Sequence, residues 1–299
     1  MEDWDDLRIF LAVARGQSLS AAGRVLKRDP ATVGRRIARF EAGTGQQLFL
    51  RSPMGYALTD AGARLLRHAE AMETAQAQAR AALAGPGEEL SGQIRIGAPD
   101  GCANYLLPQV VAQLAARHPG LDLQIVALPR VFNLSRREAD MAIAISLPPG
   151  GRLIAQKIAD YRLVMAAAQP YLDAAPPLAQ LADLPAHRIV GYIPEMIFDP
   201  ELDYLAPLGL EPRLASNAVP VQMALIREGA GIGVVHGFAL PATPGLRRVL
   251  PDFALTRSFH LIRHEADRAL PGMARLARAL VSGLRREITR LERLALSGT

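Results

Sequence analysis

The sequence predicts an α+β, multidomain protein with a small helical unit at its N-terminus and a larger α/β region after it. Three observations predict this organisation. The length, 299 residues, is about twice that of an average domain. Basic residues gather between Arg15 and Arg67, ten against three acidic ones, so that the rest of the chain is slightly acidic. After a turn-rich break at 85–92, strand-like and helix-like segments alternate.

Composition excludes several classes of protein. Half of the residues are apolar and 21% are charged, which is enough to build a core. No apolar run approaches the roughly 18 to 20 residues that cross a bilayer, and the acidic start is not a signal peptide. The single cysteine excludes an internal disulfide and a cysteine-rich zinc site. We therefore expect a reduced, cytoplasmic setting, with no membrane partner, no cofactor and no metal.

Three short helices are expected at the start, over residues 5–15, 21–26 and 31–42. Ser18 or Ser20 can cap the second helix, and Asp29-Pro30 marks the turn into the third. On the third helix, three apolar residues share one face and three polar or basic residues share another. The apolar face is Val33, Ile37 and Phe40, and the other is Thr32, Arg35 and Arg39.

Two extended runs follow, 48–51 and 56–58, around a Ser-Pro-Met-Gly turn that predicts a β-hairpin. Any surface helix has a charged face, so the third helix alone would indicate little. Together with the preceding tight turn and the hairpin, it predicts a winged helix-turn-helix. Almost all the cation is arginine, whose planar fork can hold a phosphate or a guanine edge, although arginine-rich composition also arises from genome bias.

Residues 7–62 resemble the N-terminal module of LysR-type transcriptional regulators. The motifs that carry the resemblance are Phe10-x-x-Val13-Ala14, Ser18-Leu19, an Arg-x-Ile stretch ending at Glu41, then Gly45, Leu48-Phe49, Arg51 and Leu58-Thr59-Asp60-Ala61-Gly62. Pro30, Gly34 and Arg28 depart from the family pattern, so two side-chain hydrogen-bonders are missing. DNA contacts are expected from Ser20, Arg28, Thr32, Arg35, Arg36, Arg39 and Arg51. Arg35 or Arg36 is expected to reach base edges, and Arg39 and Arg51 to hold phosphates.

A long alanine-rich helix is predicted from Asp60 to about Ala84. It has a heptad-like seam of Leu58, Gly62, Leu65, Ala69, Met72, Gln76, Ala79 and Leu83. This seam suggests a dimerisation helix, and the resemblance implies a linker helix here. The alternative is an amphipathic helix that packs on its own domain. A two-fold dimer predicts an inverted-repeat DNA target.

Beyond the break, the alternating pattern argues for parallel sheets in an α/β fold. This region resembles, more weakly, the family's effector-binding domain, with two α/β subdomains like those of a periplasmic binding protein. The resemblance rests on Gly92-x-Ile94-x-Ile96-Gly97, Leu106-Leu107-Pro108, His118-Pro119, 139–143 and Gly229-x-Gly231-Ile232-Gly233. Expected boundaries are 1–60 for DNA binding, 61–91 for the linker helix and hinge, and 92–299 for effector binding. Within the last, subdomain I comprises about 92–165 and 265–299, and subdomain II about 166–264.

Several candidate chemical motifs fail. Val234 stands where a dinucleotide-binding G-x-G-x-x-G needs its third glycine, so Gly229 is better explained as the end of a helix. His260 and His264 lie in a strand-like run without zinc partners. Cys102 follows Asp100 at the start of a helix, where a thiolate pKa could be lowered, yet a lone cysteine usually only packs. Asp100 is interpreted as a helix N-cap whose carboxylate would repel an anionic effector.

Matching strand ends and helix starts to the family pattern suggests effector contacts at Asp100, Gly101, Cys102, Pro129, Arg130, Ser146, Asn217 and His236. Each has a structural alternative: Asn217 can cap a helix, Arg130 can be a solvated turn residue, and His236 can be a satisfied strand-end residue.

These observations predict a sequence-specific transcriptional regulator without catalytic residues, whose DNA binding or activation responds to a small-molecule effector held between the two subdomains. Double-stranded DNA and self-association to a dimer or tetramer are expected, and contact with RNA polymerase is left open. One alternative is an enzyme or solute-binding protein built on the α/β region. A second is a constitutive DNA-binding protein whose C-terminal domain is vestigial and senses nothing; a ligand-induced change in thermal stability would distinguish it.

Overall fold

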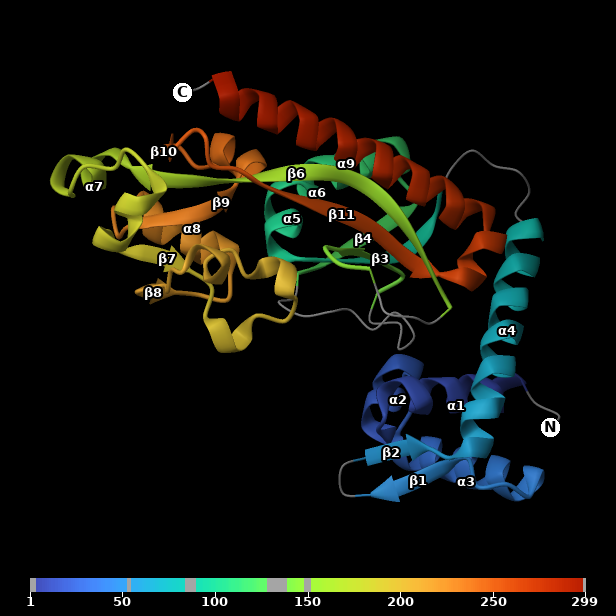
Figure 1. The fold of residues 1–299 in the computed structure, drawn as a ribbon. Coiled ribbons are helices and arrows are strands. Elements are labelled where there is room, and N and C mark those ends of the chain that lie inside the picture. Colours follow the sequence, from blue (N-terminus) through green and yellow to red (C-terminus); the bar gives the residue numbers. More distant parts are fainter. Residues whose placement is uncertain (1–3, 53–54, 84–89, 128–138, 148–151, 298–299) are drawn as a thin grey trace. The chain divides into compact units, whose positions relative to one another are not determined.

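A computed structural model describes residues 4–52, 55–83, 90–127, 139–147 and 152–297 (Figure 1). It divides into two compact units, one formed mainly by residues 1–88 and the other by most of the chain from Glu89 onward. In chain order, the helices and strands of the first unit are α1 (Trp4–Gly16), α2 (Leu19–Leu26), α3 (Pro30–Thr44), β1 (Phe49–Ser52), β2 (Gly55–Leu58) and α4 (Asp60–Leu83).

The first unit is a helix-turn-helix with a β-hairpin wing. Ser18 caps α2 by accepting a hydrogen bond from the Ala21 amide at 3.0 Å, which decides between the two expected caps. β1 and β2 pair antiparallel, with Phe49 opposite Leu58. The core under the wing and helices includes Phe10, Val33 and Phe49. The three expected helices and the hairpin are confirmed.

Helix α4 is joined to α1 by an ion pair between Arg15 and Glu73, with 2.7 Å between Nη2 and Oε2. Along the predicted seam, Gly62 and Ala69 are buried in the first unit, whereas Met72 is 44% exposed. The side chain of Leu83 lies outside the described residues. Within one chain, the beginning of the seam therefore packs on its own domain and the next turns face solvent.

The second unit is built on a nine-stranded mixed sheet in the described residues, with strand order β4-β3-β5-β11-β6-β9-β7-β8 and β10 beside β6. Its elements are β3 (Gly92–Ala98), α5 (Asp100–Tyr105), α6 (Leu107–Arg117), β4 (Leu121–Ala127), β5 (Met141–Ala144), β6 (Leu153–Ala168), α7 (Gln169–Ala174), β7 (Ile189–Gly191), β8 (Leu214–Ala215), α8 (Val219–Arg227), β9 (Ile232–His236), β10 (Leu246–Val249), β11 (Leu255–His264) and α9 (Pro271–Ser297).

The sheet has two halves that share two long strands. β3, β4 and β5 pair in parallel in the first half, and β7, β8 and β9 do so in the second. β6 and β11 run antiparallel to each other from one half into the other (Figure 1). The prediction of parallel sheets is thus correct for each half and wrong for β6, β10 and β11. The sequence predicts a helix over 105–117; α6 covers 107–117, and a separate short helix, α5, precedes it and ends at Tyr105.

Helix α9 lies along β6 and binds its backbone. The Glu292 carboxylate accepts a hydrogen bond from the Arg162 amide at 2.6 Å, and Arg285 donates to the Ile158 carbonyl. No helix in the described part of the chain is both long enough and apolar enough to span a bilayer.

Candidate functional site

The exposed face of α3 is positioned by both of its ends. Asp29 caps the N-terminus, where its side chain accepts hydrogen bonds from the Ala31 and Thr32 amides, and Pro30 occupies the first turn. Gly45 ends the helix with φ at +65°, a left-handed conformation that glycine adopts without strain. Val33, Ile37 and Phe40 are buried, as predicted. Burial of this face leaves Arg35 and Arg39 in solvent on the other.

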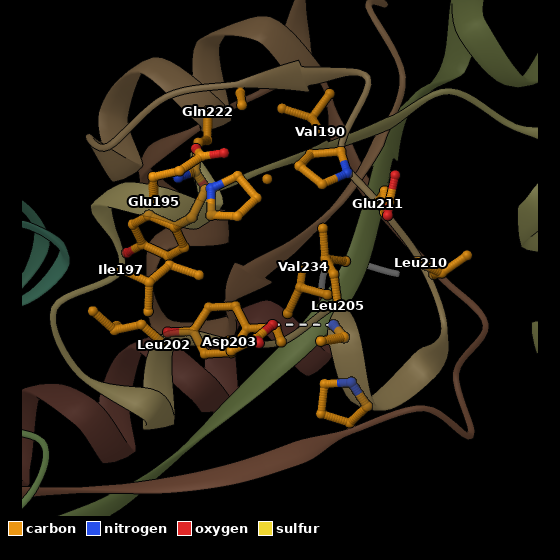
Figure 2. A pocket seen from close by; sticks show the side chains of 18 of the residues that line it. Val190, Glu195, Ile197, Leu202, Asp203, Leu205, Leu210, Glu211, Gln222 and Val234 are labelled. Atoms are coloured by element: carbon orange, nitrogen blue, oxygen red, sulfur yellow. Dashed lines mark hydrogen bonds between the residues drawn. The ribbon is translucent and has the colours of Figure 1, made fainter.

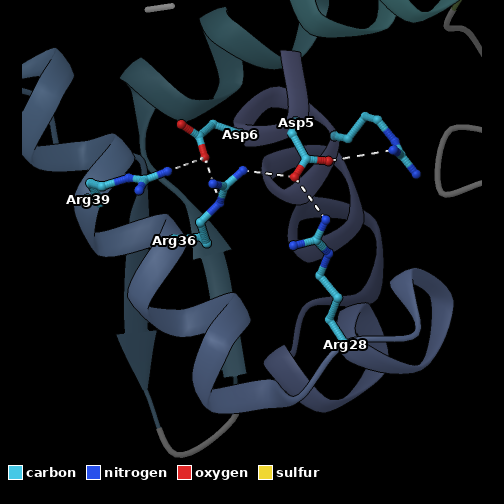
Figure 3. Close-up of polar contacts among 6 residues, drawn as sticks. Asp5, Asp6, Arg28, Arg36 and Arg39 are labelled. Carbon is cyan, nitrogen blue, oxygen red and sulfur yellow. Dashed lines mark hydrogen bonds and ion pairs between the residues drawn. The ribbon is translucent and has the colours of Figure 1, made fainter. Parts of the chain in front are cut away.

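Two acidic residues of α1 neutralise much of the expected cationic surface. Asp5 pairs with Arg28 at 3.0 Å and with Arg36 at 2.8 Å. Asp6 pairs with Arg36 at 3.0 Å and with Arg39 at 3.4 Å. Figure 3 shows both carboxylates facing the guanidinium groups of α3 and the preceding turn. Arg36 lies between the two acids with its side chain 20% exposed, so it ties α3 to α1.

The wing is attached to α3 through a single carboxylate. Glu41 accepts hydrogen bonds from the Leu48 and Phe49 amides at 2.8 and 3.1 Å, and its other oxygen pairs with Arg51 at 3.4 Å. The Arg51 guanidinium also lies 5.8 Å from the centre of the Tyr56 ring. Its side chain remains 54% exposed, which leaves it accessible to a phosphate.

The predicted DNA contacts thus fall into two groups. Ser20 and Arg35 are exposed, and Arg35 donates a hydrogen bond to the Thr32 hydroxyl at 2.9 Å. Among the described residues no carboxylate pairs with Arg35. The second group, which pairs with acids, is Arg28, Arg36, Arg39 and Arg51. The sequence pattern alone does not predict Asp5 and Asp6 as the partners of the first three of these arginines, because the pairs join residues 23 to 33 positions apart.

In the second unit, Asp100 joins the two halves of the sheet. One carboxylate oxygen accepts a hydrogen bond from the Gly101 amide at 2.9 Å, and the other accepts one from the Val219 amide at 2.5 Å. Val219 begins α8, so Asp100 caps that helix from the other half of the sheet. Interpretation of Asp100 as the cap of its own helix is therefore wrong: Pro99 precedes α5, and the carboxylate reaches a helix 119 residues away. Burial raises the pKa of Asp100, although its hydrogen bonds oppose the shift.

His236 is buried beside Asp100 and Gly101. A Cβ added at Gly101 would lie 2.8 Å from the imidazole, so only glycine leaves room for the ring. The ring stacks on Tyr161, with 5.5 Å between centroids. Burial lowers the pKa of His236 to about 4, so the ring is neutral at pH 7. The His236 Nδ1 and the Tyr161 hydroxyl are buried without hydrogen-bond partners in the described residues.

A second contact between the halves joins Ser146, just beyond β5, to Asp199. The serine hydroxyl donates to the carboxylate at 2.7 Å, and Asp199 is 7% exposed. Asn217 lies just before α8 but makes no capping hydrogen bond there, because Ala218 is the capping position. Pro129 and Arg130 lie outside the described residues. Asp100, Gly101, Ser146 and His236 therefore lie where the halves of the sheet meet.

Cys102 is fully buried in α5, and burial raises the pKa of its thiol. The expectation that the helix start could lower this pKa is wrong, because the apolar surroundings disfavour the thiolate. Cys102 packs in the core of the second unit. His260 lies in β11, and no cluster able to hold a metal occurs among the described residues.

The sequence interpretation missed Asp199 and Tyr161, which complete the junction between the halves. Asp199 is followed by Pro200, and its side chain also caps the short turn there by accepting from the Glu201 amide. An Asp-Pro pair is a recognisable turn signal. No local signal indicated that Ser146 is its second partner, because the two residues lie 53 positions apart.

Comparisons with known proteins agree with this architecture. Residues 4–63 match the model of the bacterial regulatory helix-turn-helix proteins of the lysR family. Residues 87–285 match the model of the LysR substrate binding domain. The second match covers most of the chain, and the protein belongs to the LysR family of transcriptional regulators.

Two relatives and one solved structure illustrate the similarity. The HTH-type transcriptional regulator DgdR of Burkholderia cepacia is 32% identical over 80% of this chain and 79% of its own. PtxR of Pseudomonas aeruginosa, another regulator of this type, is 27% identical over 95% and 92% of the two chains. Full-length OxyR C199D from Pseudomonas aeruginosa superposes with a TM-score of 0.69 at 16% identity, covering 95% of each chain. This last similarity concerns the fold alone.

Proposed function

We propose that this LysR-type regulator binds specific DNA through α3 and its wing and responds to a small-molecule effector held between the halves of its sheet. The observation that carries the proposal is the exposed face of α3, where Thr32, Arg35 and Arg39 lie over a buried apolar face. Arg35 is free of acidic partners in the described residues and is suited to reading a base edge. Arg39 and Arg51 are suited to phosphates, which position the helix.

Arg39 and Arg51 fit this role because their side chains remain 62% and 54% exposed although they pair with Asp6 and Glu41. A surface ion pair contributes roughly 0 to 1 kcal/mol, so little free energy is lost when a phosphate replaces Asp6 beside Arg39. Arg36 is more enclosed, and we assign it to holding α3 against α1. Of the two arginines expected to read bases, Arg35 and Arg36, we therefore propose Arg35.

The proposed assembly is a dimer through α4, or a tetramer built from dimers, acting in the cytoplasm on an inverted repeat. Met72, exposed in the single chain, is a candidate contact between copies. The proposed units are residues 1–60, 61–91 and 92–299. No catalytic function is assigned, and the relatives are transcriptional regulators.

For the effector, we propose the junction at Asp100, Gly101, Ser146 and His236, with Cys102, Asn217, Pro129 and Arg130 as further candidates. Support comes from the unpartnered His236 Nδ1 and Tyr161 hydroxyl, since buried polar groups usually have partners. The Asp100 carboxylate at the N-terminus of α8 disfavours an anionic effector there. A ligand that prefers one closure of the halves would shift the population of DNA-binding states.

The test is selection of bound sequences from random duplex DNA by the full-length protein, followed by footprinting with and without candidate metabolites. We expect an inverted repeat protected on one face, with a pattern that changes with the effector. Binding without sequence preference would contradict the first half of the proposal. A specific footprint unaffected by any metabolite, with no ligand-induced thermal stabilisation, would favour the constitutive alternative.

A further inference from the structure

A large cavity lies entirely within the second half of the C-terminal sheet. Its volume is about 1040 Å³, and all its lining residues fall between Val190 and Val234 (Figure 2). They belong to β7, β8 and β9, to α8 and to the turn-rich segment that joins β7 to β8. The lining includes none of the proposed effector contacts, so this cavity is a separate site from the junction between the halves.

The charged side chains that line the cavity are all acidic. Three carboxylate side chains line it, those of Glu195, Asp203 and Glu211, and no lining residue is lysine, arginine or histidine. Figure 2 shows Glu195 and Glu211 on opposite sides of the cavity. Like charges around one concave surface attract a cation and repel an anion. Asp203 also accepts a hydrogen bond from the Ala206 amide at 3.0 Å, which keeps its carboxylate fixed.

The remaining wall of the cavity is apolar and aromatic. Tyr192 and Tyr204 line the cavity and pack edge to face, with centroids 5.9 Å apart. Tyr204 is 5% exposed, and its hydroxyl is enclosed by the protein, without a hydrogen-bond partner in the part of the chain that the structure describes. Aromatic faces also attract cations.

We propose that this cavity binds an organic cation, an amine with an apolar or aromatic body, in addition to the effector at the junction. The ammonium group is attracted by the three carboxylates, which face the cavity from different sides, and the body contacts the tyrosines and the aliphatic wall. The site is also placed to influence the junction. Phe198 and Pro200 line the cavity, while Asp199 between them binds Ser146 of the other half.

The test compares three probes of the same shape: 3-phenylpropylamine, 3-phenylpropan-1-ol and 3-phenylpropionate. Binding to the full-length protein is measured by titration calorimetry without DNA. We expect the amine to bind about tenfold more tightly than the alcohol, a difference of about 1.4 kcal/mol, and the carboxylate to bind least. Equal binding of the three probes, or no amine binding at millimolar concentration, would overturn the proposal. Because DNA is absent, neither result bears on the proposed DNA-binding function.

Variants then locate the amine. Glu195 and Glu211 are exposed, so Glu195→Gln and Glu211→Gln should fold normally. We expect each to weaken amine binding about threefold and the double variant about tenfold, with the affinity for the alcohol unchanged. Glu228→Gln is the matched control, because Glu228 is an exposed acid outside the cavity that pairs with Arg227. Equal effects of the control and the double variant, or no effect of either, would place the amine elsewhere and refute the site.

Discussion

The two units use carboxylates in opposite ways. In the first unit, the side chains of Asp5 and Asp6 are 28% and 13% exposed, and they pair with Arg28 and Arg39, which remain 42% and 62% exposed. In the second, Asp100 and Asp199 are partly or fully buried and accept hydrogen bonds from a backbone amide or a hydroxyl across the junction. Surface pairs can be exchanged for another anion such as phosphate, whereas buried hydrogen bonds specify one arrangement of the chain. The first unit therefore carries ion pairs that another anion can replace, whereas the hydrogen bonds of the second unit hold its two halves in one arrangement.

The largest expected effect is the loss of stability when Asp100, in the second unit, is replaced. Asp100→Ala removes the acceptor for both the Gly101 and Val219 amides. We expect the free energy of unfolding to fall by about 3 kcal/mol, since each hydrogen bond to a charged group contributes about 1.5 to 3 kcal/mol. Urea unfolding of the full-length protein measures it. Asp100→Asn keeps one of the two acceptors and is the control, with a smaller expected loss; a loss as large as that of alanine would contradict the capping role.

The Asp100→Asn variant also tests how the stability of the protein depends on pH. Because the pKa of Asp100 is raised by burial, the folded state holds this proton more tightly than the unfolded state. Its contribution to stability is complete below the unfolded pKa of about 3.9 and is lost as pH rises through the higher, folded pKa. Stability of the native protein relative to Asp100→Asn should therefore decrease over that window.

The next largest expected effect is that of His236 on the pH dependence of stability, which runs in the opposite direction to that of Asp100. The pKa of His236 is lowered to about 4 in the folded protein, against about 6.5 in an unfolded chain. The unfolded state takes up the proton first, so stability is complete above about pH 6.5 and falls as pH drops toward 4. At pH 5 we expect a loss of about 2 kcal/mol, which urea unfolding of wild type and His236→Asn should reveal. Parallel pH profiles for the two proteins would contradict it.

On the exposed side, Arg35→Ala should weaken binding to the selected DNA about tenfold, or about 1.4 kcal/mol, because one base contact is lost. Binding to random duplexes should change much less. Anisotropy titrations against both DNAs measure the ratio. Arg39→Ala is the matched control and should weaken both DNAs to the same extent. Should Arg35→Ala also weaken both equally, the assignment of Arg35 to base reading is wrong.

The smallest effect concerns Arg36. Asp5 and Asp6 hold its side chain, so Arg36→Ala should reduce stability by about 1 kcal/mol and leave the preference for the selected DNA unchanged. A double-mutant cycle with Asp6→Ala isolates the pair. A loss of sequence preference in Arg36→Ala, at a concentration where the variant is folded, would show that Arg36 reads bases after all.

Local patterns predicted the first unit well because its structure is made of neighbours in sequence. The spacing of Val33, Ile37 and Phe40 was sufficient to place the exposed face of α3. The second unit depends on contacts between distant residues. Three of these contacts are the pairing of β6 with β11, the capping of α8 by Asp100 and the bond from Ser146 to Asp199. In each case the local sequence of one segment does not indicate which segment it contacts. The sequence does not predict the cavity lined by Tyr204, because much of its wall is formed by short turns in which apolar residues have no regular spacing.

The ion pair between Arg15 and Glu73 has a mechanical consequence. It ties α1 to α4 at a point where both side chains are mostly enclosed, and Arg36 in turn ties α1 to α3. A rotation of α4 about its axis would therefore move α1 and α3 with it, and with them the proposed DNA-binding face.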